Sequence, residues 1–246
     1  MTERPFAHVI GDPIAQSKSP VIHGFWLEKL GIEADYSTER VSAGNLGAYV
    51  DRVSKDPRWR GTNVTMPLKL EALERADVAH SIARRIGVSN TLVPAASGDG
   101  GKIGAFNTDA AGFLEPLQAH LKNKHYFRMA RILGTGGAAR AIVTALYDEG
   151  FTLVLAGRNP AKARAMLDEL APKGEHHAIA LDHFAQPTDF AFDDREGCFD
   201  LIVNASPLGM TGQPPLSFDW SHAPPGAIVY DIVTSPLETE FLKSAR

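Results

Sequence analysis

The segment "ILGTGGAARAIVTAL" constrains the fold of this chain more than any other part of its sequence. It places Gly134, Gly136 and Ala139 at the spacing G-x-G-x-x-[GA], after a strand predicted at 129–133 and at the start of a helix predicted at 137–149. The first glycine permits a tight turn, the second lets the backbone approach a pyrophosphate, and the small third residue lets the helix pack closely. A tight turn without a ligand can have the same spacing, but the strand-to-helix context favours a dinucleotide site.

Strands and helices are expected to alternate along most of the chain, as judged from apolar periodicity and from proline, glycine and capping signals. In the first half, strands are expected at 6–10 and 34–41, in a segment that ends at residue 65, and within 88–94 and 102–108. In the second half they are expected at 129–133, 151–156, 177–181, 200–205 and 227–233. Helices are expected from Ser19 as N-cap with Pro20 at the first helical position and Gly31 beyond the end, after Ser42, and at 67–85, 109–121, 137–149 and 160–170. The turn-rich "AASGDGGK" is expected to connect a hairpin.

This alternation predicts an α/β fold in which a parallel sheet is covered by helices. We place the boundary between two domains near the helix at 109–121. The expected organisation is an α/β domain at 1–108, a Rossmann-like dinucleotide-binding domain with a parallel sheet at 109–236, and a C-terminal helix at 237–246.

The composition is that of an ordinary globular protein, with 44% hydrophobic and 22% charged residues. A net charge of -4 without a Lys/Arg-rich stripe gives no electrostatic reason to expect nucleic acid as a partner. Cys198 is the single cysteine, which excludes a disulfide within the chain and fits a reducing compartment. With no run of 18 apolar residues, we expect a cytoplasmic protein that does not cross a membrane, as a monomer or homodimer.

The residues after the next predicted strand bear on the choice of dinucleotide. NAD-binding sites usually carry an acid there for the ribose 2′-hydroxyl, whereas this chain has "AGRNPAKAR". Arg158 stands where an acid would repel a 2′-phosphate, and Lys162 and Arg164 add positive charge nearby. Basic residues at a helix start can also lack any function. Because a helix N-terminus disfavours cations, however, a functional reason for these residues is favoured, and NADP is the expected cofactor.

Other common chemistries lack their motifs in this sequence. The nine histidines include no H-E-x-x-H, and adjacent His176 and His177 lack the spacing that would direct both toward one metal, so no metal site is expected. The sequence also has no G-x-S-x-G elbow and no P-loop lysine motif. Chemistry that uses a nicotinamide cofactor remains.

Eight segments together resemble the shikimate dehydrogenases over nearly the whole chain. In order they are "GDPIAQSKSP", "NVTMPLK", "GVSNT", "GAFNTDAAG", "GTGGAAR", "AGRNPAKA", "NASPLGM" and "YDIVTSPLET". The resemblance implies a substrate domain followed by a Rossmann domain. It also implies the reversible reduction of 3-dehydroshikimate to shikimate with NADPH, in the pathway to aromatic amino acids.

The resemblance also implies roles for individual residues. Lys69 and Asp109 correspond to the catalytic pair, and Ser17 and Ser19 to the hydroxyls that hold the substrate carboxylate. The other substrate contacts are implied at Thr65, Asn90, Asp109 and Thr234. Cofactor contacts are implied at Gly134, Thr135, Gly136, Gly137, Ala138, Arg158, Asn159, Lys162 and Ile232. For Ser19, Thr65 and Asn90, a purely structural role in capping a helix or ending a strand is the alternative.

The reaction explains why a lysine and an aspartate would be needed. Hydride delivery to a ketone leaves charge on oxygen, so an acid must stand within hydrogen-bond reach to protonate it. A lysine beside an aspartate can do this while staying oriented.

Three features depart from the family pattern. Thr234 replaces a tyrosine that lines the substrate site, and Gly157 replaces the asparagine of the usual N-R-T. The family also continues past "FLKSAR" with a helical segment whose glutamine reaches the substrate, so the C-terminal helix here is expected to be shortened while heading back toward the N-terminal domain. The alternatives are a quinate or aminoshikimate dehydrogenase and a non-catalytic NADP-binding paralogue.

Overall fold

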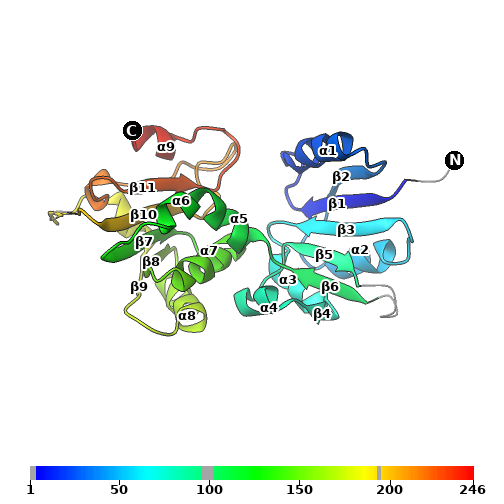
Figure 1. Ribbon diagram of the computed structural model, residues 1–246, viewed down its shortest axis with the longest axis horizontal. Coiled ribbons are helices and arrows are strands. Elements are labelled where there is room, and N and C mark those ends of the chain that lie inside the picture. The colour runs from blue at the N-terminus through cyan, green and yellow to red at the C-terminus, as the bar shows by residue number, and fades with distance from the viewer. Residues whose placement is uncertain (1–3, 96–101, 193–194) are drawn as a thin grey trace. The chain divides into compact units, whose positions relative to one another are not determined.

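The computed structural model describes residues 4–95, 102–192 and 195–246. The chain forms two compact units, Met1–Thr108 and Asp109–Arg246, each built around its own sheet (Figure 1). Most of the predicted hairpin connection between the two strands before residue 108 lies outside the described residues.

Unit 1 contains a mixed sheet with the strand order β2-β1-β3-β5-β6-β4 within its described residues. Its strands are β1 (Phe6–Gly11), β2 (Asp35–Arg40), β3 (Trp59–Val64), β4 (Val78–Ala79), β5 (Thr91–Pro94) and β6 (Ile103–Phe106). β1 pairs in parallel with both β2 and β3, whereas β5 runs antiparallel to β3 and β6. The sheet therefore changes strand direction only around β5.

Helices cover both faces of this sheet, with α1 over β1 and β2 and with α2 and α3 on the other side (Figure 1). The helices of unit 1 are α1 (Ser19–Leu30), α2 (Leu46–Val53), α3 (Lys69–Arg75) and α4 (Ser81–Ile86). The core under α2 and α3 is formed by fully buried side chains such as Ile10, Leu46, Val50, Leu68 and Leu92.

The expectation of one helix over 67–85 was wrong, because β4 interrupts it between α3 and α4. Ala76 is extended, and the Asp77 backbone N–H donates to the Ile103 carbonyl at 2.9 Å while the Asp77 carboxylate accepts from the Ile103 N–H at 2.8 Å. Pairing with β6 therefore replaces helical hydrogen bonds at this point. The helix expected after Ser42 is α2, which begins at Leu46.

Unit 2 contains a parallel sheet with the order β11-β10-β7-β8-β9 among its described residues. Its strands are β7 (Phe127–Leu133), β8 (Thr152–Gly157), β9 (His177–Ala180), β10 (Cys198–Asn204) and β11 (Ile228–Asp231). This is the expected Rossmann-like arrangement, in which the strand order reverses between β7 and β10.

The helices of unit 2 lie on both faces of its sheet, with α7 and α8 on one face and α9 on the other (Figure 1). They are α5 (Asp109–Leu114), α6 (Gln118–Leu121), α7 (Gly137–Asp148), α8 (Pro160–Leu170) and α9 (Glu240–Ser244), with short 3₁₀ helices η1 (Glu115–Leu117), η2 (Leu181–Ala185) and η3 (Trp220–His222). The helix expected over 109–121 is thus interrupted by η1 around Pro116, which lacks the N–H that an α-helix needs.

The ends of β1 and β3 are pressed together at Gly11. A Cβ on Gly11 would lie 2.5 Å from Thr65 Cγ2 and 2.7 Å from the Met66 carbonyl oxygen. Backbone hydrogen bonds hold the two segments at this distance, from the Thr65 N–H to the Ile10 carbonyl at 2.9 Å and from the Asp12 N–H to the Met66 carbonyl at 3.0 Å. Only glycine fits here without moving backbone atoms.

We expect Gly11→Ala to lower the free energy of unfolding by about 1–3 kcal/mol, the usual cost of overpacking a tight site. The midpoint and slope of urea unfolding measure the loss. Gly24→Ala is the matched control, because nothing lies within 4 Å of a Cβ at Gly24 within α1. That control should be neutral or stabilising, since alanine is favoured over glycine in a helix. Unchanged stability in Gly11→Ala would mean that the two strand ends can separate at no cost.

Candidate functional site

The carboxyl ends of β1 and β3 form the first candidate site, in unit 1. The strand order 2-1-3 reverses at β1, and ligands of open α/β sheets bind beyond the carboxyl ends of strands at such a reversal. The segment that follows β1 includes Ser17 and Ser19, and the segment that follows β3 includes Thr65 and Lys69. The fold therefore directs four of the predicted site residues to one end of this sheet.

The loop after β1 is fixed by the side chain of Asp12. Arg40 Nε donates to Asp12 Oδ1 at 2.9 Å, and Ser42 Oγ donates to Asp12 Oδ2 at 3.0 Å. These bonds to Arg40 and Ser42 lower the pKa of the Asp12 carboxyl, because they stabilise its charged form. Asp12 thus ties the start of the serine-containing loop to the end of β2.

Ser17 and Ser19 lie at the start of α1, but not in the expected capping arrangement. Ser19 is the first residue of the helix instead of its N-cap, and Lys18 occupies the N-cap position without a side-chain hydrogen bond. The Ser17 hydroxyl accepts from the Ser19 N–H at 3.3 Å, so Ser17 partly fulfils the capping role that was expected of Ser19. Pro20 consequently stands at the second helical position.

Thr65, Lys69 and Asn90 are brought together by backbone contacts around the end of β3. The Val64 N–H donates to the Asn90 carbonyl at 2.7 Å, and the Ser89 N–H donates to the Lys69 carbonyl at 2.8 Å. Lys69 is half-buried as the first residue of α3, and Ser89 is fully buried. The three residues therefore lie on segments that backbone hydrogen bonds join to one another.

The side chain of Asn90 is bonded to the residue that precedes Asp109. Asn90 Nδ2 donates to Thr108 Oγ1 at 2.8 Å, and the Thr108 N–H donates to Asn90 Oδ1 at 3.1 Å. The neighbouring Asn107 is buried, and its Nδ2 donates to the Val88 carbonyl at 3.1 Å. Asp109 is half-buried and is the first residue of α5, in unit 2.

The second candidate site, in unit 2, is the turn between β7 and α7. Gly134 has φ 127, and a Cβ there would lie 2.8 Å from the Ala205 carbonyl carbon and oxygen, so this position requires glycine on both grounds. Gly136 is the N-cap of α7, Gly137 begins the helix, and Ala139 is fully buried. Thr135, Gly136, Gly137 and Ala138 therefore form the turn and first helical residues that a pyrophosphate site would use.

The residues after β8 lie beside a cavity that suits the other end of a dinucleotide. Exposed Arg158 follows β8 and lines a cavity of about 420 Å³ together with Leu181, Asp182 and residues after β10. Asn159 caps α8, because its Oδ1 accepts from the N–H groups of Ala161 and Lys162 at 3.0 and 3.3 Å. A guanidinium beside a cavity at the carboxyl end of the sheet is the arrangement that a 2′-phosphate would need.

Thr135 offers a physical reason for the glycine at position 157. A Cβ on Gly157 would lie 2.6 Å from Thr135 Cγ2 and 3.3 Å from Thr135 Oγ1. A larger residue at position 157 would therefore require the Thr135 side chain to shift.

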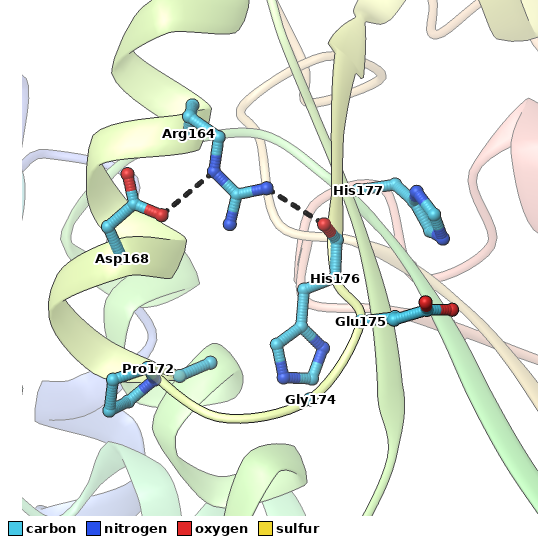
Figure 2. A pocket seen from close by; sticks show the side chains of 8 residues that line it. Arg164, Asp168, Pro172, Gly174, Glu175, His176 and His177 are labelled. Atoms are coloured by element: carbon cyan, nitrogen blue, oxygen red, sulfur yellow. Dashed lines mark hydrogen bonds and ion pairs between the residues drawn. The ribbon is translucent and has the colours of Figure 1, made fainter.

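Arg164, which the sequence placed near Arg158, points elsewhere. Figure 2 shows its side chain between Asp168 and the backbone of His176, with Nε donating to Asp168 Oδ1 at 3.0 Å and Nη1 donating to the His176 carbonyl at 2.8 Å. His176 is also engaged, since Nδ1 accepts from the Leu153 N–H at 3.1 Å and Nε2 lies 2.9 Å from the Lys173 carbonyl. The hollow at this position, about 670 Å³, is lined by Arg164, Asp168 and His176 together with residues of the turn before β9.

A buried polar network that sequence reasoning missed holds the loops after β10 and β11. Asn204 is fully buried, and its Nδ2 donates to Asp231 Oδ1 at 3.0 Å and to the Leu208 carbonyl at 2.9 Å. Thr239 donates to Asp231 Oδ2 at 2.7 Å, and the Ile232 N–H donates to the Asn204 carbonyl at 3.2 Å. Ile232 is thus firmly placed after β11, while nearby Thr234 is exposed. The sequence signal that could have predicted this network is an asparagine at the end of one strand and an aspartate at the end of the following strand.

Membrane-spanning helices and metal clusters are both absent from the described ranges. Within them, no helix combines the length and the apolar character needed to cross a membrane. The same part of the chain contains no group of three or more His, Cys, Asp or Glu side chains that could hold a metal ion.

Comparison with known proteins identifies the family. The family model described as the shikimate dehydrogenase substrate binding domain matches residues 9–92. The NADP(+) shikimate dehydrogenase of Sphingopyxis alaskensis is 46% identical over 243 residues, covering 98% of this chain and 81% of the relative.

Solved structures agree with these sequence matches. Shikimate 5-dehydrogenase from Thermus thermophilus in complex with shikimate has a TM-score of 0.77 and 33% identity, covering 98% of this chain and 82% of that one. A structure of the same enzyme with NADP(H) and shikimate has a TM-score of 0.75 and 32% identity, covering 98% and 83%. The family model matches the substrate domain, and the sequence and structural similarities extend over nearly the whole chain. The chain therefore belongs to the shikimate dehydrogenase family.

Proposed function

We propose that this chain catalyses the reversible, NADPH-dependent reduction of 3-dehydroshikimate to shikimate, in the cytoplasm and on the route to aromatic amino acids. The observation that carries the proposal is the near full-length similarity to NADP(+)-dependent shikimate dehydrogenases. The two candidate sites support it, because one offers hydroxyl, amide and ammonium groups and the other offers a phosphate loop followed by an arginine.

The residues of unit 2 fit NADP. The N-terminal turn of α7, with Gly136 and Gly137, would hold the pyrophosphate, and Arg158 beside its cavity would pair with the 2′-phosphate. Asn159 would contribute mainly by fixing the start of α8, since its Oδ1 caps that helix. Ile232 would pack beside the nicotinamide, and Lys162 would add positive charge near Arg158. Bound NADPH supplies the hydride.

The residues of unit 1 fit a small polyhydroxylated acid. The hydroxyls of Ser17 and Ser19 would donate to the substrate carboxylate, and Thr65 and Asn90 would bond to ring hydroxyls. Such a site rejects poor substrates, because they would leave its polar groups unpaired. Thr234 would contribute a shorter side chain than the tyrosine of the family pattern.

Lys69 and Asp109 are proposed as the catalytic pair. Lys69 Nζ would donate a proton to the ketone oxygen as negative charge develops there, and Asp109 would orient both the ammonium group and the substrate hydroxyl. The Ser89 N–H donates to the Lys69 carbonyl, so the Lys69 side chain starts from a fixed point of the backbone.

Quinate dehydrogenase is the second candidate function, because Thr234 stands where the family pattern has a substrate-lining tyrosine, in the part of the site that would choose between shikimate and related ring acids. Side-by-side assays of NADP reduction with shikimate, with quinate and without substrate separate the candidates. We expect NADP reduction with shikimate and none with quinate or without substrate. Greater catalytic efficiency with quinate would replace the proposed substrate, and no turnover with either would favour a non-catalytic NADP-binding paralogue.

Lys69→Met should lower kcat by about a hundredfold or more, the usual scale of general acid-base catalysis, while NADPH binding stays near the parental value. The reason is that the ammonium group would act in the transition state and hardly at all in cofactor binding. Steady-state kinetics with shikimate and fluorescence titration with NADPH measure the two quantities. Exposed Lys55 provides the control Lys55→Met, which should keep parental kcat. A parental kcat in Lys69→Met would mean that Lys69 has no catalytic role.

Arg158→Ala should raise KM for NADP by about tenfold or more and erode the preference over NAD, since a charge-assisted hydrogen bond is worth about 1.5–3 kcal/mol. Kinetics with both cofactors at saturating shikimate measure the change. Arg164→Ala is the matched control on α8, because its guanidinium bonds to Asp168 and His176 instead. Equal efficiency of the parent with NADP and NAD would rule out the role given to Arg158.

A further inference from the structure

One carboxylate at the end of β11 joins three segments of unit 2. Asp231 Oδ1 accepts from Asn204 Nδ2 at 3.0 Å, at the end of β10, and from the Val233 N–H at 2.9 Å, in the loop after β11 itself. Asp231 Oδ2 accepts from the hydroxyl of Thr239, the N-cap of α9, at 2.7 Å. The loop after β11 is therefore joined through Asp231 to β10 and to α9.

The Asn204 side chain that contacts Asp231 can adopt only one orientation. Its Nδ2 also donates to the Leu208 carbonyl at 2.9 Å, and its Oδ1 accepts from the N–H and the hydroxyl of Ser206 at 3.1 and 2.7 Å. A carbonyl can only accept and a backbone N–H can only donate, so the amide cannot turn over. Asn204 and Thr239 are both fully buried, so solvent water does not compete for their bonds to Asp231.

Asp231 holds the part of this loop that strand pairing does not reach. The Ile232 N–H donates to the Asn204 carbonyl at 3.2 Å, which extends the pairing of β11 with β10 by one residue. The next N–H, that of Val233, donates to the Asp231 side chain instead. An aspartate that accepts from the N–H two residues further on closes a turn of the backbone. The backbone on the carboxyl side of Ile232 is therefore positioned by Asp231.

The place of this loop in the sheet is where the nicotinamide end of NADP would lie. The strand order reverses between β7 and β10, and a dinucleotide lies across the crevice at such a reversal. In the proposed function, the turn after β7 holds the pyrophosphate and Arg158 after β8 pairs with the 2′-phosphate. The other end of the cofactor then extends over the loops after β10 and β11.

We propose that Asp231 is a positioning residue that fixes the loop after β11 for the nicotinamide half of NADP, an inference that rests on the NADP binding in the proposed function. The carboxylate acts through the backbone of Val233 and does not touch the cofactor. Loss of the carboxylate keeps the bond between Ile232 and Asn204, so the disturbance is confined to the residues that follow the Ile232 N–H. The adenosine half of the site is left unchanged.

Two ligands separate the two halves of the cofactor site. NADPH occupies both halves, whereas adenosine 2′,5′-bisphosphate keeps the 2′-phosphate and lacks the nicotinamide. Fluorescence titration measures the Kd of NADPH, and calorimetry measures the Kd of the bisphosphate. Steady-state kinetics with shikimate gives kcat, and circular dichroism gives the melting temperature.

Two substitutions of Asp231 separate geometry from charge. Asp231→Ala removes the bonds to Asn204, Val233 and Thr239 together. Asp231→Asn can keep all three, because its Oδ1 still accepts from Asn204 and Val233 and its Nδ2 can donate to the Thr239 hydroxyl.

Another buried carboxylate of the same sheet provides the control. Asp200 lies on β10 four residues before Asn204, toward the amino end of the strand. Its Oδ2 accepts from Arg195 Nη2 at 2.7 Å, and its Oδ1 accepts from Arg131 Nη1 at 3.4 Å. Asp200→Asn should lower the melting temperature and leave the Kd of both ligands unchanged.

Asp231→Ala should raise the Kd of NADPH by about three- to tenfold, the change expected for the loss of about one hydrogen bond's worth of contact. Its kcat should fall by about tenfold or more, because a small misplacement of reacting groups is costly. Its Kd for adenosine 2′,5′-bisphosphate should stay parental. Asp231→Asn should keep the Kd of both ligands within about twofold of the parent.

The outcomes separate this inference from the proposed function. A parent that does not bind NADPH overturns both. A parent that binds NADPH and does not oxidise shikimate overturns the proposed function alone, because the binding comparison still tests Asp231. Parental affinity for NADPH in Asp231→Ala overturns the positioning role.

Three further results would also overturn the positioning role. Equal weakening of NADPH and bisphosphate binding in Asp231→Ala, or failure of that variant to fold, would make the role of Asp231 structural. Loss of NADPH affinity in Asp231→Asn as large as in Asp231→Ala would assign the effect to the negative charge. The same loss in Asp200→Asn would show that any weakened carboxylate of this sheet has this effect.

Discussion

Close packing of strand ends at the reversal of strand order is the constraint on which both candidate sites depend. In unit 1, Gly11 at the end of β1 leaves no room for a Cβ against Thr65 and Met66 after β3. In unit 2, Gly134 after β7 is similarly close to Ala205 after β10. Each glycine lets the loop after one strand meet the loop after its neighbour. The polar groups carried by those loops can then converge on one ligand.

The two units use this close packing of strand ends for different chemistry. After β1 and β3 the loops carry hydroxyls, an ammonium group and an amide, which suit a polyhydroxylated acid. After β7 the glycines expose backbone N–H groups at the start of α7, which suit a pyrophosphate. The same sheet reversal therefore suits either of the two proposed sites, according to the few residues beyond the strand ends.

Local packing also accounts for one departure from the family pattern. The Thr135 side chain lies where a Cβ at position 157 would begin, so a larger residue there would require that side chain to shift. Arg158, the next residue, is exposed and lines its cavity with glycine at position 157. No comparable packing argument accounts for Thr234, which is exposed.

The sequence alone predicted the α/β class, the phosphate turn and most strands of both sheets, because these depend on local signals: glycine spacing, apolar runs and capping residues. It was wrong over 67–85, where pairing of Asp77 with Ile103 replaces helical bonds, and it assigned the N-cap of α1 to Ser19 although Ser17 Oγ accepts the N–H of that residue. The tertiary structure alone decided that Arg164 turns away from Arg158 and that Tyr36, Asn63, Thr91 and Asn90 form one hydrogen-bond chain. Hydrogen bonds between distant strands depend on sheet order and register, which local sequence patterns do not encode.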